Sequence, residues 1–502
     1  LAETVPVSFD AVRPGPRSIG WRPDAPASLT WVEATDGGDP AKEATVRDRV
    51  FTLAAPFKGA GAPLADLGYR YAGLEFAEDG TALLKEDWWK TRRERTWVIA
   101  PGAAPRLLFD RSSEDRYGDP GSPVTRRTAR GTFVLATTPD GKGVFFTGAG
   151  ASPEGNKPFL DRVDLTSGQA ERLWQSQAPH YAYVAQVLDK AGDRLLISRE
   201  SPTEPPNYFL KEGAKTTPVT RFAHPTPALA KVQKELITYS RADGVKLSGT
   251  LYTPEGYDAK RDGPLPLVMW AYPREFKSAE AAGQVDKSPH AFNRVSYWSP
   301  MVWLSRGYAV LDDPKLPIIG QGKTEPNDSY VEQLVAGAKA AVDAVVERGV
   351  ADRHRIAIGG HSYGAFMTAN LLAHSDLFAA GIARSGAYNR TLTPFGFQAE
   401  ERIFWDAQDT YYKMSPFMNA HKINEPLLLI HGAADSNPGT YPMQSERLYQ
   451  AMKGLGGRAR LVMLPHEEHG YRARESLLHM LYETSEWLDA HVKNRKAEPS
   501  QP

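Results

Sequence analysis

Cysteine is missing from this 502-residue chain. Its absence excludes disulfide bonds, a thiolate nucleophile and a zinc site with cysteine ligands. Net charge is missing too, because 60 Lys and Arg residues balance 60 Asp and Glu residues. A nucleic-acid-binding protein would carry a basic excess or a basic stripe, so we expect no nucleic-acid partner.

Long apolar stretches are also missing. None approaches the roughly 18 residues that a membrane helix needs, and the longest candidates, such as 264–270, have the length of core strands. We therefore expect a soluble protein with no membrane partner. The chain begins at Leu1 without an initiator methionine, so we expect that residues have been removed from its start. The compartment stays open between cytoplasm, periplasm and secretion.

What is present in the first 225 residues is a many-stranded β pattern. Short β-branched and aromatic runs alternate with Gly, Pro and Asp turns. Turn residues between two such runs recur about 50 to 60 residues apart, the spacing of a propeller blade. These turn residues are Asp24, Asp79, Asp140 and Asp189.

Four strands per repeat suit a β-propeller, because each blade buries its faces only against its neighbours. We expect an all-β propeller over 1–225 with about four blades. Because a closed ring usually has more, we expect it to be incomplete at its N-terminus. A β-sandwich is the alternative, but so long a meander without a compact hairpin-dense unit fits it less well.

The proline-rich segment 223–227 marks a boundary, and beyond it strand and helix patterns alternate. Such alternation is typical of a doubly wound, mainly parallel sheet covered on both faces, so we expect an α/β domain over 226–502. Strands are expected at 245–253, 266–271, 308–312, 355–359, 378–384, 426–431 and 460–464, and helices at 328–349, 364–374, 441–454 and 474–493.

The most informative motif is Gly360–Gly364, which reads G-H-S-Y-G and has the form G-x-S-x-G. It lies between the expected strand 355–359 and a helix start at 365–372. A serine on such a turn exposes its hydroxyl at the top of a sheet, and small neighbours permit the strained backbone. A chance match would explain the five residues but not their flanks. We therefore expect Ser362 to be a nucleophile.

A serine nucleophile needs a base to take its proton and an acid to orient that base. In α/β-hydrolases these follow in the order Ser, Asp or Glu, His, each in a loop after a strand. Asp435 follows the expected strand 426–431, and His469 follows the expected strand 460–464. We expect Asp435 to be the acid and His469 the base, with His466 as the alternative base.

The His-x-x-His spacing of the two candidate bases also resembles a metal site. A zinc enzyme would need a third ligand and helical placement, and neither is visible, so we expect no metal and no organic cofactor. The oxyanion of an acyl transfer needs two donors instead. We expect these to be the backbone N–H of Tyr363 and the phenol of Tyr272, which follows the strand pattern 267–271.

Longer stretches around these residues resemble the prolyl oligopeptidase family of serine peptidases, and within it the glutamyl endopeptidase branch, which has chloroplast and bacterial members. The stretches that carry the resemblance are 88–92, 110–115, 359–374, 381–397, 414–417, 431–440 and 464–476.

This resemblance implies a propeller followed by an α/β-hydrolase catalytic domain, with Ser362 as nucleophile, Asp435 as acid and His469 as base. It places the side-chain oxyanion donor on Tyr272. Asn437 corresponds to an asparagine that binds a substrate carbonyl in related exopeptidases. The resemblance also implies a plastid location in plant relatives.

The implied reaction is hydrolysis of oligopeptides or unfolded segments, with the propeller excluding folded proteins. A preference for Glu at P1, the residue on the acyl side of the cleaved bond, requires a partly buried cation, preferably an arginine fork. Arg390 is our first choice, because this segment lines the S1 pocket in the family. Arg384, Arg274 and Arg472 are the alternatives.

Competing functions remain open at this point. A dipeptidyl or acylaminoacyl exopeptidase would share the catalytic set, but it needs a cap for the substrate N-terminus, commonly a pair of glutamates from the propeller, and no convincing pair is visible there. A carboxylesterase would share the serine motif but rarely carries a propeller. A non-catalytic propeller scaffold would not need the Ser, Asp and His set.

Overall fold

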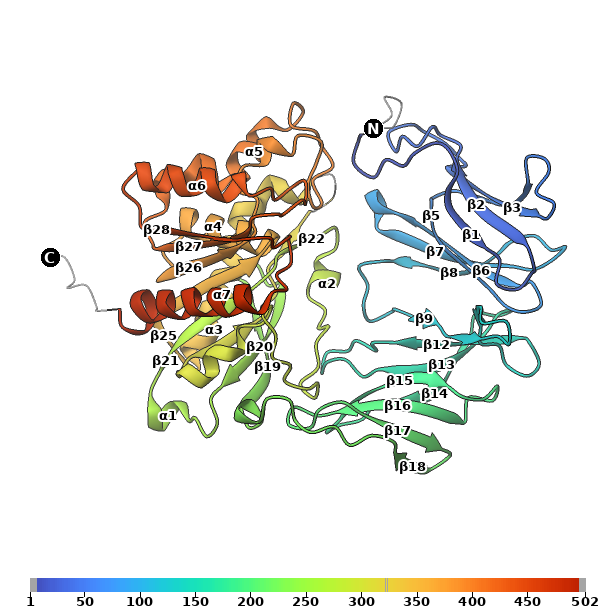
Figure 1. The fold of residues 1–502 in the computed structure, drawn as a ribbon, viewed down its shortest axis with the longest axis horizontal. Helices are drawn as coiled ribbons and strands as arrows, with labels where there is room; N and C mark the ends of the chain where they lie inside the picture. Colours follow the sequence, from blue (N-terminus) through green and yellow to red (C-terminus); the bar gives the residue numbers. More distant parts are fainter. Residues whose placement is uncertain (1–6, 321, 323, 496–502) are drawn as a thin grey trace. The chain divides into compact units, whose positions relative to one another are not determined.

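The computed structural model describes residues 7–320, 322 and 324–495, and the chain divides into two compact units (Figure 1). The N-terminal unit runs to Ala223 and includes the short segment His290–Phe292. The C-terminal unit contains His224–Pro289 and the chain from Asn293 onward.

Antiparallel sheets build the N-terminal unit, and in its described residues four of them have four strands each. The first contains β1 (Arg17–Trp21), β2 (Ser28–Ala34), β3 (Asp48–Ala54) and β4 (Ala62–Leu67). The second contains β5 (Arg70–Phe76), β6 (Ala82–Trp88), β7 (Arg93–Ile99) and β8 (Arg106–Ser112). The third contains β9 (Ser122–Pro123), β12 (Gly143–Gly148), β13 (Phe159–Asp164) and β14 (Ala170–Gln175), and the fourth β15 (Tyr181–Val187), β16 (Arg194–Glu200), β17 (Asn207–Glu212) and β18 (Lys215–Pro218). A further pair is formed by β10 (Thr125–Arg127) and β11 (Phe133–Leu135).

Each four-stranded sheet packs on the next through its apolar residues. Successive strand side chains point to opposite faces, so Leu84 of β6 joins a buried cluster with the first sheet, while Leu83 joins one with the third. Phe145 and Leu160 likewise join the third sheet to the fourth. The apolar residues thus bury both faces of an inner sheet against its neighbours.

The four turn aspartates occupy equivalent places in this arrangement. Each lies in the loop that leads into the second strand of its sheet, namely β2, β6, β12 or β16. Asp79, Asp140 and Asp189 accept hydrogen bonds from backbone N–H groups two to five residues further on. The spacing in the sequence therefore indicates a turn that recurs before the second strand of each four-stranded sheet.

An eight-stranded sheet forms the centre of the C-terminal unit, in the order β19-β20-β23-β21-β25-β26-β27-β28. Strand β20 runs antiparallel to both neighbours, and the pairs from β23 to β28 are parallel. The strands are β19 (Gln233–Ser240), β20 (Lys246–Thr253), β21 (Leu265–Trp270), β23 (Ala309–Asp312), β25 (Ala351–His361), β26 (Ala380–Arg384), β27 (Leu427–Gly432) and β28 (Ala459–Leu464).

Helices cover both faces of this sheet, and Figure 1 shows them packed around its strands. One core cluster packs α3, α4 and α6 against the sheet, and a second packs α7 with residues around Trp303 against the other face. The helices are α1 (Ala259–Asp262), α2 (Ala279–Ala282), α3 (Tyr330–Glu347), α4 (Tyr363–His374), α5 (Gln408–Met414), α6 (Met443–Gly454) and α7 (Arg474–Leu488), and β22 (Arg274–Phe276) pairs with β24 (Pro317–Ile319) beside them. This unit is an α/β domain, as the alternating pattern predicts.

The described residues contain no helix that combines the length and apolar character required to cross a bilayer.

Candidate active site

Ser362 lies on the turn between β25 and α4, with a φ of 59° and a ψ of −116°. A positive φ is uncommon for a residue with a side chain and is kept only where the surroundings enforce it. Its N–H donates a hydrogen bond to the Arg384 carbonyl oxygen at 2.8 Å, which fixes the turn to β26. The turn exposes a serine at the carboxyl ends of the parallel strands.

The two glycines of the motif are required by close packing. A Cβ on Gly360 would lie 2.5 Å from the backbone of Gly364, and a Cβ on Gly364 would lie 2.5 Å from the Ala271 carbonyl oxygen. Only glycine leaves room for α4 to approach β21 so closely. The sequence pattern G-x-S-x-G is therefore a direct consequence of this geometry.

Tyr363 begins α4, so its backbone N–H is one of the helix amides without an intrahelical acceptor. Its side chain is fully buried and donates a hydrogen bond to Glu275, while its ring stacks on Phe366 at 5.2 Å between ring centroids. The helix start beside Ser362 is thus anchored through a side chain as well as through the backbone.

Asp435 and His469 form the central pair of the candidate site. His469 Nδ1 lies 2.8 Å from Asp435 Oδ2, and the Asp435 side chain is buried while that of His469 remains 28% exposed. The alternative base, His466, is exposed and adopts a positive φ of 61°. Among the residues that the structure describes, no hydrogen bond joins Asp435 to His466, so the geometry favours His469.

Three further groups hold the Asp435 carboxylate. His431 Nε2 and Thr440 Oγ1 each lie 3.1 Å from Oδ2, and the Asn437 N–H donates to Oδ1 at 3.0 Å. Sequence reasoning did not include His431 or Thr440. The one available signal was the position of His431 four residues before the acid, at the end of the same strand.

Electrostatics favour an ionised Asp435. Burial would raise the pKa of this carboxyl, but hydrogen bonds from His431, His469 and the Asn437 N–H hold it well below its usual range. Burial, followed by the charges of His469 and Arg384, lowers the pKa of His361 to about 3. His361, whose ring centroid is 4.8 Å from that of His469, is therefore a neutral neighbour of the pair.

A cavity of about 410 Å³ opens beside the serine. Ser362, Arg390, Asn437 and Thr440 line it together, with an apolar wall from the segment 392–397. Since Thr440 Oγ1 also lies 3.1 Å from His469 Nδ1, this cavity adjoins the Asp435–His469 pair. In the described part of the chain no hydrogen bond joins Ser362 Oγ to His469.

Arg390 is the charged residue of this cavity. It is buried, and its guanidinium lies over the rings of Phe366, Phe397 and Tyr363 at 4.2, 4.5 and 5.4 Å from their centroids. Its Nε has no hydrogen-bond partner, and among the described carboxylates none forms an ion pair with it. Burial lowers the pKa of Arg390, although the side chains of Tyr363, Tyr330 and Glu275 oppose this effect.

The other expected arginines do not line the cavity. Arg384 is buried against Trp270 on the opposite face of the sheet and donates to the Tyr297 carbonyl oxygen at 2.7 Å. Arg274 is exposed in β22, and Arg472 is exposed in the loop before α7. The structure thus brings only Arg390, of the four arginines, together with Ser362.

Tyr272, the expected oxyanion donor, lies next to the elbow. Its ring is 5.8 Å from that of Tyr363, and it would be 3.7 Å from a Cβ on Gly364. Burial raises the pKa of Tyr272, while an interaction with the Gln398 side chain opposes this shift. The phenol therefore keeps its proton at neutral pH and can donate a hydrogen bond.

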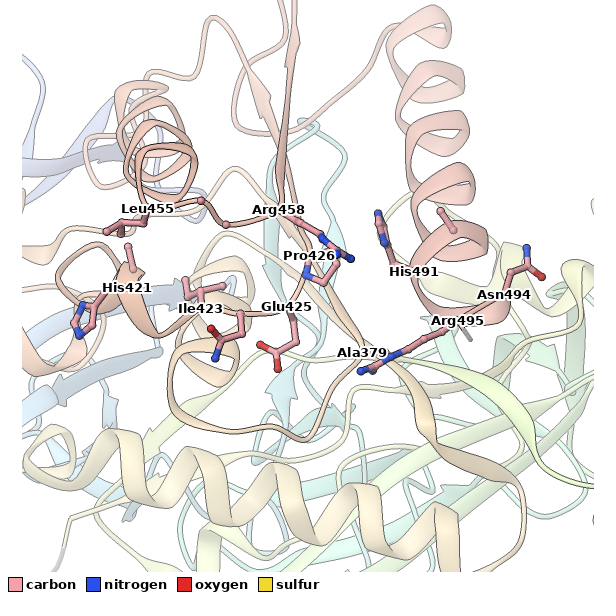
Figure 2. Close-up of a pocket in the computed structure, with 15 residues that line it drawn as sticks. Ala379, His421, Ile423, Glu425, Pro426, Leu455, Arg458, His491, Asn494 and Arg495 are labelled. Carbon is pink, nitrogen blue, oxygen red and sulfur yellow. The ribbon is translucent and has the colours of Figure 1, made fainter. Parts of the chain in front are cut away.

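A second cavity, of about 670 Å³, lies at the other end of the sheet (Figure 2). Glu425 and Pro426 directly precede β27 and Arg458 directly precedes β28, so it opens at the amino ends of these strands. Figure 2 shows Arg458 extending toward His491. None of the expected site residues lines this cavity.

Comparisons with known proteins agree with this fold. Residues 321–495 match the model of the prolyl oligopeptidase family. The chain is 53% identical over 512 residues to "Probable glutamyl endopeptidase, chloroplastic" of Arabidopsis thaliana, covering 98% of this chain and 53% of that protein. The protein of the same name in Oryza sativa subsp. japonica is 53% identical over 511 residues, with coverage of 98% and 54%. The chain therefore spans about half the length of these relatives.

Among solved structures, a puromycin-hydrolysing peptidase of Mycobacterium tuberculosis shares the fold with a TM-score of 0.64 and 17% identity, covering 97% of this chain and 71% of that one. The antiparallel sheets followed by an α/β domain are thus a fold that this chain shares with that structure. The chain belongs to the prolyl oligopeptidase family.

Proposed function

We propose that this chain contains the catalytic unit of a serine peptidase that hydrolyses peptide bonds through an acyl-enzyme. The observation that carries the proposal is the elbow serine Ser362 in a cavity that it shares with Thr440, which in turn contacts the Asp435–His469 pair. Within this pair, His469 Nδ1 lies 2.8 Å from Asp435 Oδ2. Family membership supports the same reaction class.

In the proposed mechanism Asp435 orients His469 by accepting the hydrogen on Nδ1. Nε2 is then free to take the proton of Ser362 as its Oγ attacks the scissile carbonyl. The same nitrogen returns the proton to the leaving amine, and a water molecule repeats the sequence on the ester. Low basicity of Asp435 suits this role, because the carboxylate stays ionised while His469 gains and loses its proton.

The tetrahedral oxyanion would be stabilised by the Tyr363 N–H and the Tyr272 phenol. The first belongs to the free amides at the start of α4, where the helix dipole also favours negative charge. Asn437, in the cavity wall, is proposed to bind a substrate carbonyl.

We further propose that the enzyme is an endopeptidase that prefers Glu at P1. The cation of Arg390 is buried in the same cavity as Ser362, and no described carboxylate pairs with it. A substrate carboxylate could supply two charge-assisted hydrogen bonds to the guanidinium fork. The relatives in Arabidopsis and Oryza, which are named as probable glutamyl endopeptidases, support this specificity.

For the N-terminal unit we propose four blades of a β-propeller, with the catalytic domain beginning near residue 226. The face-to-face packing of successive four-stranded sheets supports this assignment.

A panel of peptides blocked at both ends and differing only at P1 tests the proposal. Cleavage after Glu, absent in Ser362→Ala, is the expected result. Cleavage restricted to peptides with a free N-terminus would instead indicate an exopeptidase. Hydrolysis of esters alone would indicate a carboxylesterase, and cleavage that persists in Ser362→Ala would contradict the assigned nucleophile.

A further inference from the structure

His431 is a buried histidine that the expected catalytic set does not include. It lies at the end of β27, and its side chain is 0% exposed. Both ring nitrogens have partners: Nε2 lies 3.1 Å from Asp435 Oδ2, and Nδ1 lies 2.7 Å from Ser445 Oγ on α6. The ring thus connects a helix of the core to the acid of the candidate site.

The partners of His431 determine which nitrogen carries the hydrogen. An ionised carboxylate can only accept, so Nε2 must donate to Asp435. In a neutral imidazole the other nitrogen then accepts, so the hydroxyl of Ser445 donates to Nδ1. The hydrogen bonds therefore run in one direction, from Ser445 through His431 to Asp435.

The same carboxylate oxygen serves both histidines. Asp435 Oδ2 accepts from His431 and from His469, and Thr440 Oγ1 lies at 3.1 Å, while Oδ1 accepts the Asn437 N–H. Of these groups only His431 belongs to a strand of the central sheet, because the others lie in loops. A donor on the sheet is the most rigid reference for the direction in which the carboxylate points.

We propose that His431 is a positioning residue, which holds the Asp435 carboxylate in the orientation that directs His469 toward Ser362, with Ser445 setting its tautomer. This inference rests on the proposed function, in which Asp435 and His469 are the acid and the base. If His431 only filled the space between β27 and α6, it would be equally buried. Replacing it would then not change the catalytic rate of the molecules that fold.

The first test compares His431→Leu, His431→Gln and Ser445→Ala in the full chain. The Gln side chain can place an N–H donor near the position of Nε2, whereas Leu cannot. Loss of a group that orients a metal ligand typically costs about 10- to 100-fold in activity, and we expect a similar cost for a group that orients a catalytic carboxylate. We expect a loss of this size in kcat per active site for His431→Leu with KM nearly unchanged, partial recovery in His431→Gln, and a smaller loss in Ser445→Ala.

The matched control is Thr484→Val, which removes another buried hydrogen bond of this unit, to the Met480 carbonyl oxygen in α7. It should leave kcat unchanged. The acidic limb of the kcat/KM–pH profile should move to lower pH in His431→Leu, because a misdirected carboxylate stabilises the protonated base less well. The proposal would be overturned if His431→Leu kept the wild-type kcat per active site and the acidic limb of its kcat/KM–pH profile did not move.

Two readouts separate this inference from the proposed specificity. The rate at which a fluorophosphonate labels Ser362 depends on the base and its orientation but not on the P1 residue, and it also counts active sites. Nitrogen-15 histidine spectra should show His431 protonated at Nε2 and unprotonated at Nδ1 in the wild type. The opposite tautomer would overturn the inference on His431, whereas failure of Ser362 to label in the wild type would contradict the proposed function itself.

Discussion

Single side chains account for the chemistry and the specificity that we propose. Arg390 is a cation surrounded by the rings of Phe366, Phe397 and Tyr363, and no described carboxylate forms an ion pair with it, although the charge of Glu275 acts on it from farther away. Keeping such a charge buried costs free energy, so its place beside Ser362 has a functional explanation more readily than a structural one. A P1 carboxylate would be its natural counter-ion.

The change Arg390→Gln tests this explanation. A charge-assisted hydrogen bond contributes about 1.5–3 kcal/mol, so kcat/KM for a Glu substrate should fall about 10- to 150-fold. For the matching Gln substrate it should change little. Arg390→Lys keeps the charge but loses the fork and should lie between. Arg274→Gln, at an exposed arginine outside the cavity, is the control, and an unchanged Glu-to-Gln ratio in Arg390→Gln would exclude Arg390 as the specificity residue.

Asp312 at the end of β23 predicts a pH dependence of stability. Burial, with a contribution from Asp313, raises the pKa of Asp312 to about 7 against the opposing charge of Lys287. The folded state then binds more protons than the unfolded state between about pH 4 and 7, so the free energy of unfolding falls as the pH rises through this range.

Compared with Asp312→Asn, the wild type should therefore lose up to about 1.4 kcal/mol of stability per pH unit over this range. Urea unfolding of both proteins at several pH values between 4 and 8 measures the difference. The exposed residue Asp409 provides the control Asp409→Asn, which should follow the wild type. Parallel curves for wild type and Asp312→Asn would show that Asp312 does not titrate in this range.

At the scale of secondary-structure elements, the strand–turn–helix unit of β25 and α4 depends on two places where backbone segments pack closely together. The sequence motif identifies the turn because its glycines are sterically required, and the helix that follows presents its free amides beside Ser362. The function of the serine therefore depends on how closely α4 packs on β21.

Gly364→Ala should abolish most activity. Its Cβ would lie 2.5 Å from the Ala271 carbonyl oxygen, so α4 must move away from β21. A displacement of about 1 Å at a catalytic group can cost about 100-fold in rate, and kcat per folded molecule measures it. Gly454→Ala, at a helix end where a Cβ meets nothing within 4 Å, should keep full activity. Normal turnover by Gly364→Ala would show that the elbow tolerates the shift.

At the scale of the whole molecule, the chain consists of two units, and each unit has its own apolar clusters. The N-terminal clusters connect neighbouring antiparallel sheets, and the C-terminal clusters lie on the two faces of the mainly parallel sheet. Each unit thus has its own core, which is the usual criterion of a domain. A defect in one core should therefore affect chiefly its own unit.

Arg70→Met tests this independence. Arg70 is 4% exposed and pairs with Asp36 at 2.8 Å and with Asp48 at 3.1 Å, so its loss leaves two buried carboxylates without this partner. Breaking a buried ion pair from one side typically costs about 3–5 kcal/mol. Hydrogen exchange should accelerate in β1–β8 but not in β19–β28.

The control for Arg70→Met is Arg49→Met, which removes an exposed ion pair with Asp66 in the same part of the unit. It should produce no measurable change. Equal acceleration of exchange in both units after Arg70→Met would contradict their independence.

Local properties of the sequence were enough to predict most elements of the α/β domain. The expected strands and helices coincide with those observed, the largest difference being four residues at the start of β25, and α7 continues as a π-helical turn over 489–493. Strand β19, the short pair β22–β24 and helices α1, α2 and α5 are not expected from the sequence. Apart from β19, which has eight residues, these segments of three to seven residues carry too little periodicity.

The residue types of the candidate site could be predicted for a similar reason. Turn chemistry and motif order are encoded in neighbouring residues, so they indicate a serine on an elbow followed by an acid and a base on later loops. Two features of the site depend instead on the strand order of the sheet and on which side chains its faces bring together. They are the identity of the arginine that shares a cavity with Ser362 and the hydrogen bond from His431 to the acid. Those contacts join segments that are remote in the sequence, and local periodicity carries no information about them.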